Sequence, residues 1–536
     1  MYFRSNLLCE TLAQYKKIII YGTGNFAQKI FPQLVEHGLK EKIFCFTQTE
    51  KYESDFLNEI PVIDIKELRC DKSECVVLVA VSDLHAKEIK RVLLDFAYLN
   101  IVSLADYMVD HMKMYRLDTF EEYCEAIADW YAQKQGDKFD RPAFLKKLTE
   151  WGNAANQGIN PNLIVVICGH ISPRFVKIIG ALKRKGYEIV MLKYMAIYNP
   201  WSFEELEKEN IPTYHCDCIE EMLYRALQYS PLVYFFESML GDSRWAEIMF
   251  KNKKYFGKVI ISLYDVINDG YSGQRKSLYM SEKYALEHAD GIVWRWFSKE
   301  SLERKGFQYQ GKSIQFIDCC HRELEDEISS RQDSDPSVLK FCAIGADADF
   351  FVKRHYVSEY TDFARIGEIL EKIGNRKDCI FHFYAGSFEH MGNYEICKKY
   401  EQQYDNFKIF LATEHRELLK RLKNYDFGCD LYIKGKELTP DALVGNWRYG
   451  GDYLNSIRNT FFDFLSAGLP IITTQGDRLW EYLSAYDVVV KMYLGDLDFD
   501  YLRQHKTYYR EKVKIARKDL DVDKQIPRLI QFFKEV

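Results

Sequence analysis

The sequence predicts an α/β protein built from three Rossmann-like parallel-sheet domains. Its 536 residues exceed the roughly 250–300 at which a single hydrophobic core stops growing, so several domains are expected. Short β-branched runs alternate with helical patterns along most of the chain, as they do in strand–helix–strand units. Most of these runs are apolar throughout, which is typical of parallel strands that are covered on both faces.

The composition is that of a globular protein and excludes several functional classes. The chain is 47% hydrophobic and 28% charged, with a formal net charge of −6 and no basic arm, which argues against nucleic acid as a partner. No apolar run reaches the ~18 residues of a transmembrane segment, and the N-terminus lacks the layout of a signal peptide. We therefore expect a cytoplasmic protein, and peripheral association with the inner face of the membrane stays open.

The 14 cysteines favour a reducing compartment. Four lie inside predicted strands, where cysteine behaves as a small hydrophobic residue: Cys45, Cys168, Cys342 and Cys429. The pair Cys216 and Cys218 and the segment Cys319–His321 lack a second ligand pair at zinc spacing. We predict neither a metal site nor a cofactor.

The N-terminal residues form a strand, a glycine turn and a helix. The apolar run Lys17–Tyr21 leads into Gly22-Thr-Gly24-Asn25, and a helical pattern follows. Gly22 permits a tight turn, and Gly24 lets backbone N–H groups approach a phosphate at the helix start. A ligand site is expected at these residues together with Asn25 and Ser82, which follows the strand Val76–Val81.

The dinucleotide motif at this turn is incomplete. Ala27 stands at the third glycine position, and Thr47-Gln-Thr49 replaces the acidic residue expected after the second strand. In the segments Ile20–Asn25, Ile60–Ile63 and Val77–Ser82, the domain resembles small Rossmann-like domains fused to bacterial sugar-modifying and surface-polysaccharide enzymes. That resemblance implies nucleotide or sugar binding, and a ligand-free role in assembly or positioning stays open.

Composition and pattern place the domain boundaries. Residues 1–112 form the first domain, and residues 113–160 form a helical connector that ends in a loop at Gly152–Pro161. Residues 161–330 and 331–520 form two further α/β domains, and residues 521–536 form a final helix near the junction of these two. Two adjacent α/β domains predict a cleft at the carboxyl ends of their strands.

The segment from Asn455 to Thr474 is the most informative stretch of the third domain. Asn459 is a suitable N-cap for a helix, and Gly468 suits the position just after its end. The free N–H groups near Thr460 form an anion site. Asp463 lies one turn further on the same side, where a carboxylate can accept two hydrogen bonds from a ribose diol.

The segment Phe462–Ile471 resembles the signature of GT-B glycosyltransferases of the family 4 type. Its sequence is Phe-Asp-Phe-Leu-Ser-Ala-Gly-Leu-Pro-Ile. The resemblance covers about residues 162–536. It implies that the last two domains form a GT-B double-Rossmann cleft and catalyse metal-independent hexosyl transfer from a nucleotide-diphosphate sugar to a hydroxyl acceptor. It also places Asp463 on the ribose and Asn455 where a sugar-contacting glutamate is usual.

The same resemblance implies further site residues. Thr413 and Glu414 match a base-recognising loop, and Arg458 lies beside the helix start where it can neutralise phosphate. The donor set is Gly345, Gly386, Thr413, Glu414, Arg458, Asn459, Thr460 and Asp463. The catalytic set is His170, Asp265 and Asn455.

The fusion pattern implies a role in bacterial surface-glycan or polysaccharide biosynthesis, with a glycan, lipid-linked or protein acceptor. A homo-oligomer stays open. Two other enzymes of the same double fold, a polyol-phosphate transferase and a sugar-nucleotide epimerase, remain alternatives. A non-catalytic GT-B-like partner of a transferase is a further alternative, because Asn455 departs from the family pattern.

Overall fold

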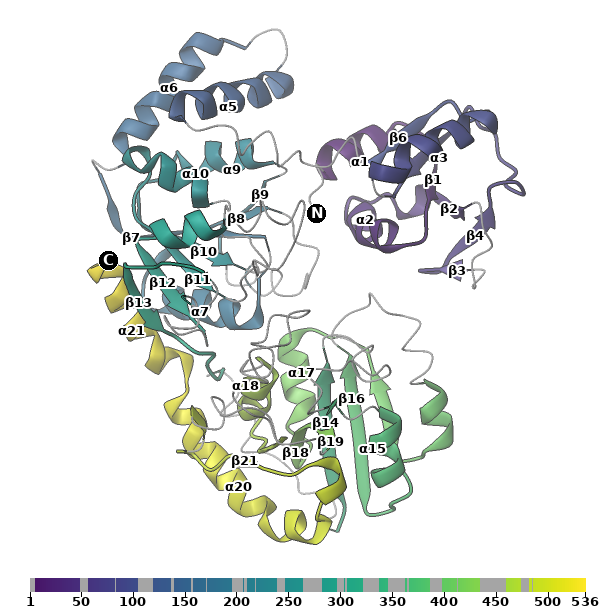
Figure 1. Cartoon of the computed structure of the whole chain (residues 1–536), viewed down its shortest axis with the longest axis vertical. Coiled ribbons are helices and arrows are strands. Elements are labelled where there is room, and N and C mark those ends of the chain that lie inside the picture. Colours follow the sequence, from purple (N-terminus) through teal and green to yellow (C-terminus); the bar gives the residue numbers. More distant parts are fainter. Residues whose placement is uncertain are drawn as a thin grey trace. The chain divides into compact units, whose positions relative to one another are not determined.

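The computed structural model (Figure 1) describes most of the chain. The described residues are 5–48, 56–81, 83–104, 119–135, 139–155, 158–169, 171–194, 206, 210–216, 218–238, 246–263, 282–295, 303, 306–321, 337–345, 362–363, 366–385, 398–411, 413–433, 459–473, 482–483 and 485–536.

The first domain is a six-stranded sheet with the order β3-β4-β2-β1-β5-β6. Its elements are α1 (Ser5–Ala13), β1 (Lys17–Tyr21), α2 (Asn25–Glu36), η1 (Lys40–Lys42), β2 (Ile43–Gln48), β3 (Phe56–Leu57), β4 (Ile60–Asp64), β5 (Cys75–Val79), α3 (Asp83–Asp95) and β6 (Ile101–Ser103). Alternate residues of β1 pack on opposite faces: Ile18 and Ile20 join α1 and α2, whereas Ile19 and Tyr21 join α3. Among the strands that the structure describes here, β3 alone pairs antiparallel, and its partner is β4.

A pair of helices follows, α5 (Phe120–Gln135) and α6 (Arg141–Ala154). Their aromatic side chains stack closely, with the rings of Tyr131 and Phe144 4.5 Å apart. The predicted loop at Gly152–Pro161 is too long, because α6 continues to Ala154 and the next strand begins at Asn160. Asp140 caps α6 by accepting a hydrogen bond from the Ala143 amide, so the helix is closed at its start by a side chain.

The second domain is a seven-stranded sheet with the order β13-β12-β11-β10-β7-β8-β9. Its elements are β7 (Asn160–Cys168), α7 (Pro173–Arg184), β8 (Glu188–Tyr194), β9 (Thr213–Cys216), α9 (Ile219–Ala226), β10 (Pro231–Ser238), α10 (Ala246–Lys251), η5 (Lys253–Tyr255), β11 (Val259–Leu263), β12 (Gly291–Trp294) and β13 (Lys312–Gln315). Strand β10 pairs parallel with both β7 and β11. The sequence predicts a strand over 315–317, but β13 already ends at Gln315.

The third domain is a six-stranded parallel sheet with the order β17-β16-β14-β18-β20-β21. Its elements are β14 (Leu339–Gly345), α15 (Ile366–Ile373), β16 (Cys379–Ala385), β17 (Phe407–Phe410), α17 (His415–Leu422), β18 (Phe427–Asp430), α18 (Asn459–Ser466), β20 (Ile471–Thr473), β21 (Val489–Val490) and η7 (Leu494–Asp496), with a separate antiparallel pair β15 (Asp362–Phe363) and β19 (Tyr432–Ile433). The sequence predicts a helix over about 362–373, and this prediction is wrong at its start, because Asp362 and Phe363 pair with β19.

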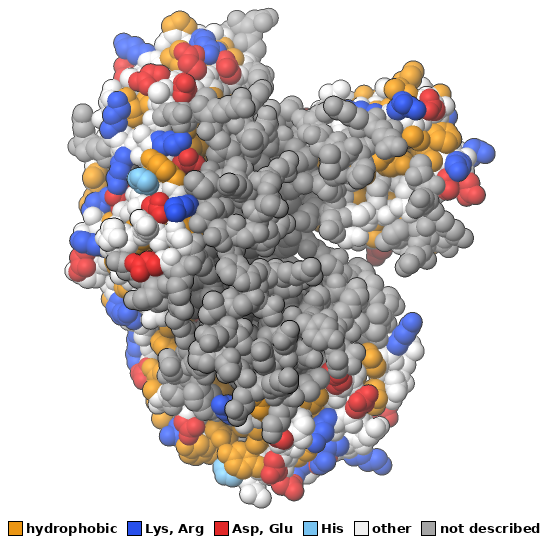
Figure 2. All heavy atoms as spheres, viewed as in Figure 1, with side chains coloured by type: hydrophobic (Ala, Val, Ile, Leu, Met, Phe, Trp, Pro, Cys, Tyr) orange, Lys and Arg blue, Asp and Glu red, His pale blue; other side chains and the backbone are white. Residues whose placement is uncertain are grey.

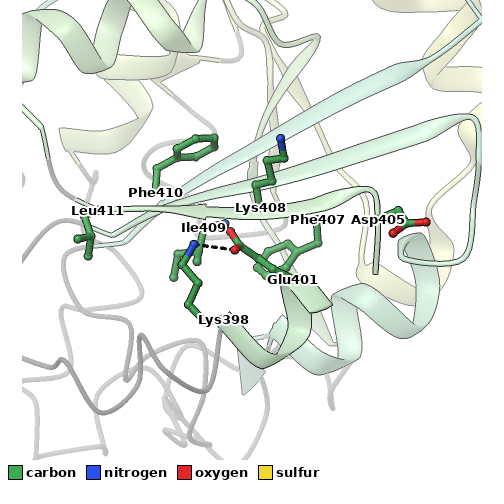
Figure 3. Close-up of a pocket in the computed structure, with 8 residues that line it drawn as sticks. All are labelled: Lys398, Glu401, Asp405, Phe407, Lys408, Ile409, Phe410 and Leu411. Atoms are coloured by element: carbon green, nitrogen blue, oxygen red, sulfur yellow. Dashed lines mark hydrogen bonds and ion pairs between the residues drawn. The ribbon is translucent and has the colours of Figure 1, made fainter. Parts of the chain in front are cut away.

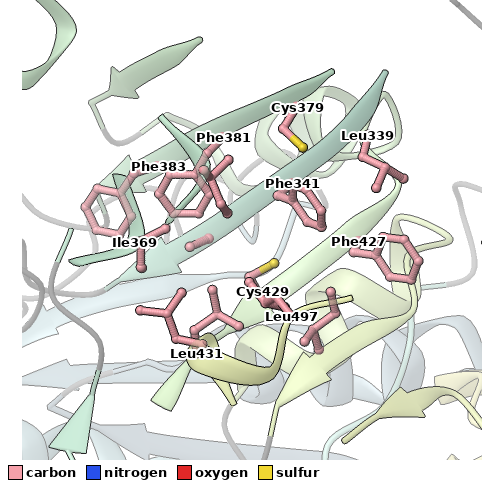
Figure 4. Packing of buried hydrophobic residues seen from close by; sticks show 14 of the residues in the cluster. Leu339, Phe341, Ile369, Cys379, Phe381, Phe383, Phe427, Cys429, Leu431 and Leu497 are labelled. Carbon is pink, nitrogen blue, oxygen red and sulfur yellow. The ribbon is translucent and has the colours of Figure 1, made fainter. Parts of the chain in front are cut away.

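Each face of the third sheet has its own hydrophobic cluster. Phe341, Phe381, Phe383 and Phe427 pack on one face with α15 (Figure 4). The other face carries Cys342 and packs against α17 and α18. The strand cysteines Cys45, Cys168, Cys342 and Cys429 are all buried, which confirms their prediction as small core residues.

The chain ends with two helices, α20 (Phe499–Asp519) and α21 (Val522–Glu535). Helix α20 packs on the third sheet through Phe499 and Leu502, whereas α21 contacts α7 and β10 of the second domain. The ring of Phe533 lies 5.0 Å from that of Phe235, and Asp523 accepts hydrogen bonds from Arg184. Two successive Rossmann-like domains with a final helix that returns to the first of them form the GT-B arrangement, and the predicted fold class is confirmed.

The chain divides into two compact units, residues 1–157, 192–198 and 213–229, and residues 158–191, 199–212 and 230–536. On the face shown in Figure 2, basic and acidic side chains are interspersed. None of the helices within the described part combines the length and the apolar character that a membrane span requires.

Candidate functional site

The parallel strands of all three sheets share an order in which the first strand lies between the second and the fourth. Ligands bind such sheets outside the carboxyl ends of the first and fourth strands, where the strand order reverses. In the third domain these ends are Gly345 of β14 and Asp430 of β18, which are both buried. The predicted donor residue Gly345 therefore lies at the reversal point of its sheet.

Helix α18 begins at Asn459, which is the first helical residue rather than the cap that the sequence predicted. It ends as predicted: Gly468 has φ +82°, a conformation that L side chains rarely adopt. The Gly468 amide bonds the Leu465 carbonyl, and the Leu469 amide bonds the Phe464 carbonyl, which is a Schellman motif. This cap fixes the position of α18 and of Asp463 on it.

Asp463 is buried, with 4% of its surface exposed. Its Oδ1 lies 2.9 Å from Nε2 of His415, the first residue of α17. Burial alone would raise the pKa of the Asp463 carboxyl, but the charge and hydrogen bond of His415 outweigh burial and lower it below its usual value. Lys177 and Arg295 act in the same direction, so the carboxylate is held in its ionised form.

The contact between His415 and Asp463 joins two segments that lie 48 residues apart. Thr413 and Glu414, which precede α17, are both partly buried, and Glu414 is its N-cap residue. Thr460 lies in the first turn of α18 and is also partly buried. The predicted base-recognising loop therefore directly precedes α17, and the predicted ribose carboxylate lies on α18, which contacts α17.

A second histidine adjoins this contact. The ring of His321 lies 5.2 Å from that of His415, and the His321 amide donates to Ser466 Oγ on α18. Burial, followed by the charge of His415, lowers the pKa of His321 well below its usual value. The sequence had singled out His321 only as a metal candidate. No group of three metal-ligating side chains occurs among the residues described.

The carboxyl edge of the second sheet carries a buried charged cluster, which we call the α7 cluster. Lys177 forms an ion pair with Asp318 at 2.7 Å, and Arg174 donates to Ser262 at 3.1 Å. Burial would lower the pKa of Lys177, but Asp318 raises it above its usual value. The remaining members are Ser172, Glu237 and Arg295, all buried. In the sequence, Glu237 follows the apolar run Leu232–Phe236 and Asp318 follows the run Gln315–Ile317, so both are predicted at strand ends. No such pattern singles out Arg174 or Lys177.

The N-terminal glycine turn has the predicted backbone. Gly22 has φ +113°, and a Cβ atom there would lie 2.9 Å from the Ala80 carbonyl oxygen, so only glycine fits without strain. Thr23 donates to the Gln48 side chain at 2.8 Å, and this glutamine occupies the end of β2 where a dinucleotide-binding sheet has an acid. Gly24 is exposed, with open space around it.

Six predicted site residues lie outside the described part of the chain: Ser82, His170, Asp265, Gly386, Asn455 and Arg458. For Asn25 and Asn459 only the helical backbone is described. The roles of all these residues stay predictions.

A hollow of about 600 Å³ lies along the edge strand β17 (Figure 3). Two of its polar side chains pair with each other: Glu401 accepts a hydrogen bond from Lys398, and it accepts a second from the Ile409 amide. None of the predicted site residues that the structure describes lines it. The hollow is therefore separate from the contact between His415 and Asp463.

No protein-family model matches the sequence, and no curated protein matches it. Sucrose-phosphate synthase from Thermosynechococcus elongatus is similar in structure at 12% identity and a TM-score of 0.45, over 70% of this chain and 98% of that protein. Anabaena Alr3699/HepE in complex with UDP-glucose has 9% identity and a TM-score of 0.49, over 70% and 100%. A putative UDP-N-acetylglucosamine 2-epimerase from Listeria monocytogenes has 10% identity and a TM-score of 0.41, over 70% and 98%. Because these TM-scores lie below 0.5, we draw no residue role from any of these proteins.

Proposed function

We propose that the chain is a glycosyltransferase that moves a sugar from a nucleotide-diphosphate sugar to a hydroxyl group. The nucleotide would bind at the reversal point of the third sheet, and the acceptor would bind to the second domain. The sequence resemblance extends the proposal to hexosyl transfer without a metal ion in bacterial surface-glycan assembly.

The observation that carries this proposal is the buried, ionised Asp463 on α18, held by His415 at the start of α17. A buried carboxylate persists where cations and hydrogen bonds compensate it, and such a group is positioned to accept hydrogen bonds from a diol. The first turns of both helices leave backbone N–H groups available for a diphosphate.

The transition state of sugar transfer builds positive charge on the sugar ring and negative charge on the leaving diphosphate. The amides and the positive end of α18, beginning at Asn459, would stabilise that negative charge. Asp463 would hold the ribose so that the diphosphate lies against the helix start. Neutral Asn455 would contribute hydrogen bonds to the sugar in place of a charge.

The test is nucleotide binding and turnover of Asp463→Ala and His415→Gln. Hydrogen bonds to a charged group contribute roughly 1.5–3 kcal/mol, so each variant should bind a nucleotide sugar roughly 10- to 100-fold more weakly. Calorimetry with a panel of UDP- and GDP-sugars would measure this effect. Asp500→Ala, at an exposed aspartate of α20, is the matched control and should bind as the natural chain does.

Unchanged affinity and turnover in both variants would refute the nucleotide site at Asp463. Products formed without any acceptor, by rearrangement of the donor sugar, would support the epimerase alternative instead. A chain that binds no nucleotide at all would support the non-catalytic alternative.

A further inference from the structure

Glu237 lies at the point in the second sheet where the strand order reverses. It is near the end of β10, next to Cys168 of β7 and Ser262 of β11 in the strand register. The crevice outside these strand ends is where ligands bind in such sheets. Ser172, the N-cap residue of α7, donates a hydrogen bond to Glu237 Oε1 at 2.7 Å and so fixes the carboxyl against the glycine turn after β7.

The Glu237 carboxyl has hydrogen-bonding capacity that the described residues leave unused. The side chain is fully buried, with 0% of its surface exposed. Its Oε2 has no hydrogen-bond partner in the described part of the chain, and Arg174 Nη1 lies 3.9 Å away. A buried carboxyl oxygen without a donor costs free energy, so a site of this kind is more stable when a hydroxyl fills it.

We propose that Glu237 is the catalytic residue that accepts the proton of the acceptor hydroxyl. This inference rests on the proposed glycosyltransferase function. The acceptor oxygen forms a bond to the anomeric carbon while the bond from that carbon to the diphosphate oxygen breaks. The bonding electrons leave with the nucleoside diphosphate, and the hydroxyl proton passes to Glu237 Oε2, which later releases it to water.

The surroundings of Glu237 suit this role. Burial raises the pKa of its carboxyl to about 7, against the opposing effects of Arg174 and of the Ser172 and Ser262 hydroxyls. A base of that strength is matched to a reaction near neutral pH. The other charged groups nearby are Arg295 after β12 and the Lys177–Asp318 pair. Arg174 keeps the ionised carboxyl from being an isolated buried charge.

The experiment measures the release of nucleoside diphosphate from UDP- and GDP-sugars, with p-nitrophenyl glycosides as acceptors, between pH 5 and 9. The natural chain should lose kcat/KM below about pH 7. Glu237→Gln should lower turnover by roughly 10²–10⁴-fold and abolish that acidic limb, while donor affinity in calorimetry stays unchanged. Glu221→Gln, at a buried glutamate paired with Arg225, controls for burying an amide and should keep both turnover and pH profile.

The variant Ser262→Ala tests whether Glu237 takes part in proton transfer or only supports the fold. The Ser262 hydroxyl lowers the pKa of the Glu237 carboxyl, so removing this hydroxyl should move the loss of kcat/KM at low pH to higher pH. Two results together would overturn the proton-accepting role. In the first, Glu237→Gln lowers the rate equally at every pH and still loses kcat/KM at low pH. In the second, Ser262→Ala leaves the pH of that loss unchanged. So would full activity of Glu237→Gln. A natural chain that binds none of the nucleotide sugars would instead refute the proposed function itself.

Discussion

A partly buried histidine gives the third domain a pH-dependent stability. His382 on β16 lies 2.5 Å from the Tyr425 hydroxyl, which in turn lies 2.9 Å from that of Tyr384. Burial, with a smaller contribution from the charge of Lys408, lowers the pKa of His382 to about 4. An unfolded histidine has a pKa of about 6.5, so the unfolded chain binds a proton at a pH where the folded chain does not.

The consequence is a loss of stability on acidification. The contribution of His382 is fully present above about pH 6.5 and is lost as the pH falls toward 4, with a limit of roughly 3 kcal/mol. Hydrogen exchange of β16 amides in urea, at pH 7.5 and 5, would measure it. His382→Gln should show a flatter dependence on pH than the natural chain. Equal slopes in the two proteins would contradict the assignment.

At the scale of elements, the packing of α18 on β18 sets the candidate nucleotide site. Gly428 of β18 faces the ring of Phe464 on α18, and a Cβ atom there would overlap that ring. Gly428→Ala should therefore shift α18, lower stability by about 1–3 kcal/mol and weaken nucleotide binding through Asp463. Urea unfolding and calorimetry would measure the two effects.

The matched control for this substitution is Gly495→Ala, because a Cβ atom at Gly495 meets no atom within 4 Å. It should leave both stability and nucleotide affinity near those of the natural chain. If Gly428→Ala destabilised the protein but left nucleotide affinity intact, α18 would not position the nucleotide.

Local sequence patterns predicted most helices and strands. The elements that these patterns missed depend on contacts between residues far apart in the chain. The turn at Gly22 and the end of α18 at Gly468 follow from the local need for positive φ, so the sequence predicted both. The pairing of segments far apart in the chain cannot be inferred this way: Asp362 looked helical, yet it pairs with Ile433 of β19. Helix α20 was not predicted, because its buried residues are sparse among charged ones.

In the candidate site, too, local patterns predicted single residues but not their distant partners. Asp463 was predicted from its place after a helix start, but its partner His415 lies 48 residues away. The contact of Glu237 with Ser172 spans 65 residues and depends on the strand order of the second sheet. Pattern reasoning identifies which residues end a strand or begin a helix. Only the fold shows which of these ends meet.

At the scale of the whole molecule, the returning helix α21 joins the end of the chain to the second domain. Phe533 is fully buried and contacts Phe235 of β10, and a Cβ atom at Gly291 of β12 would lie 2.8 Å from Phe532. The chain end therefore completes the core of the domain that carries the α7 cluster, although it lies far from that domain in sequence.

This arrangement predicts that a single substitution at the chain end weakens the second domain. Phe533→Ala should lower its stability by roughly 3–5 kcal/mol, because the cavity that it creates lies in a packed core. Hydrogen exchange of β10 and β7 amides should report the loss, while the β16 and β14 amides of the third sheet keep most of their protection.

Tyr508→Ala, at a side chain of α20 that is 47% exposed, is the control. Unchanged protection of β10 in Phe533→Ala would show that the second domain is stable without the chain end, and equal losses in both sheets would show that the two domains unfold as one unit.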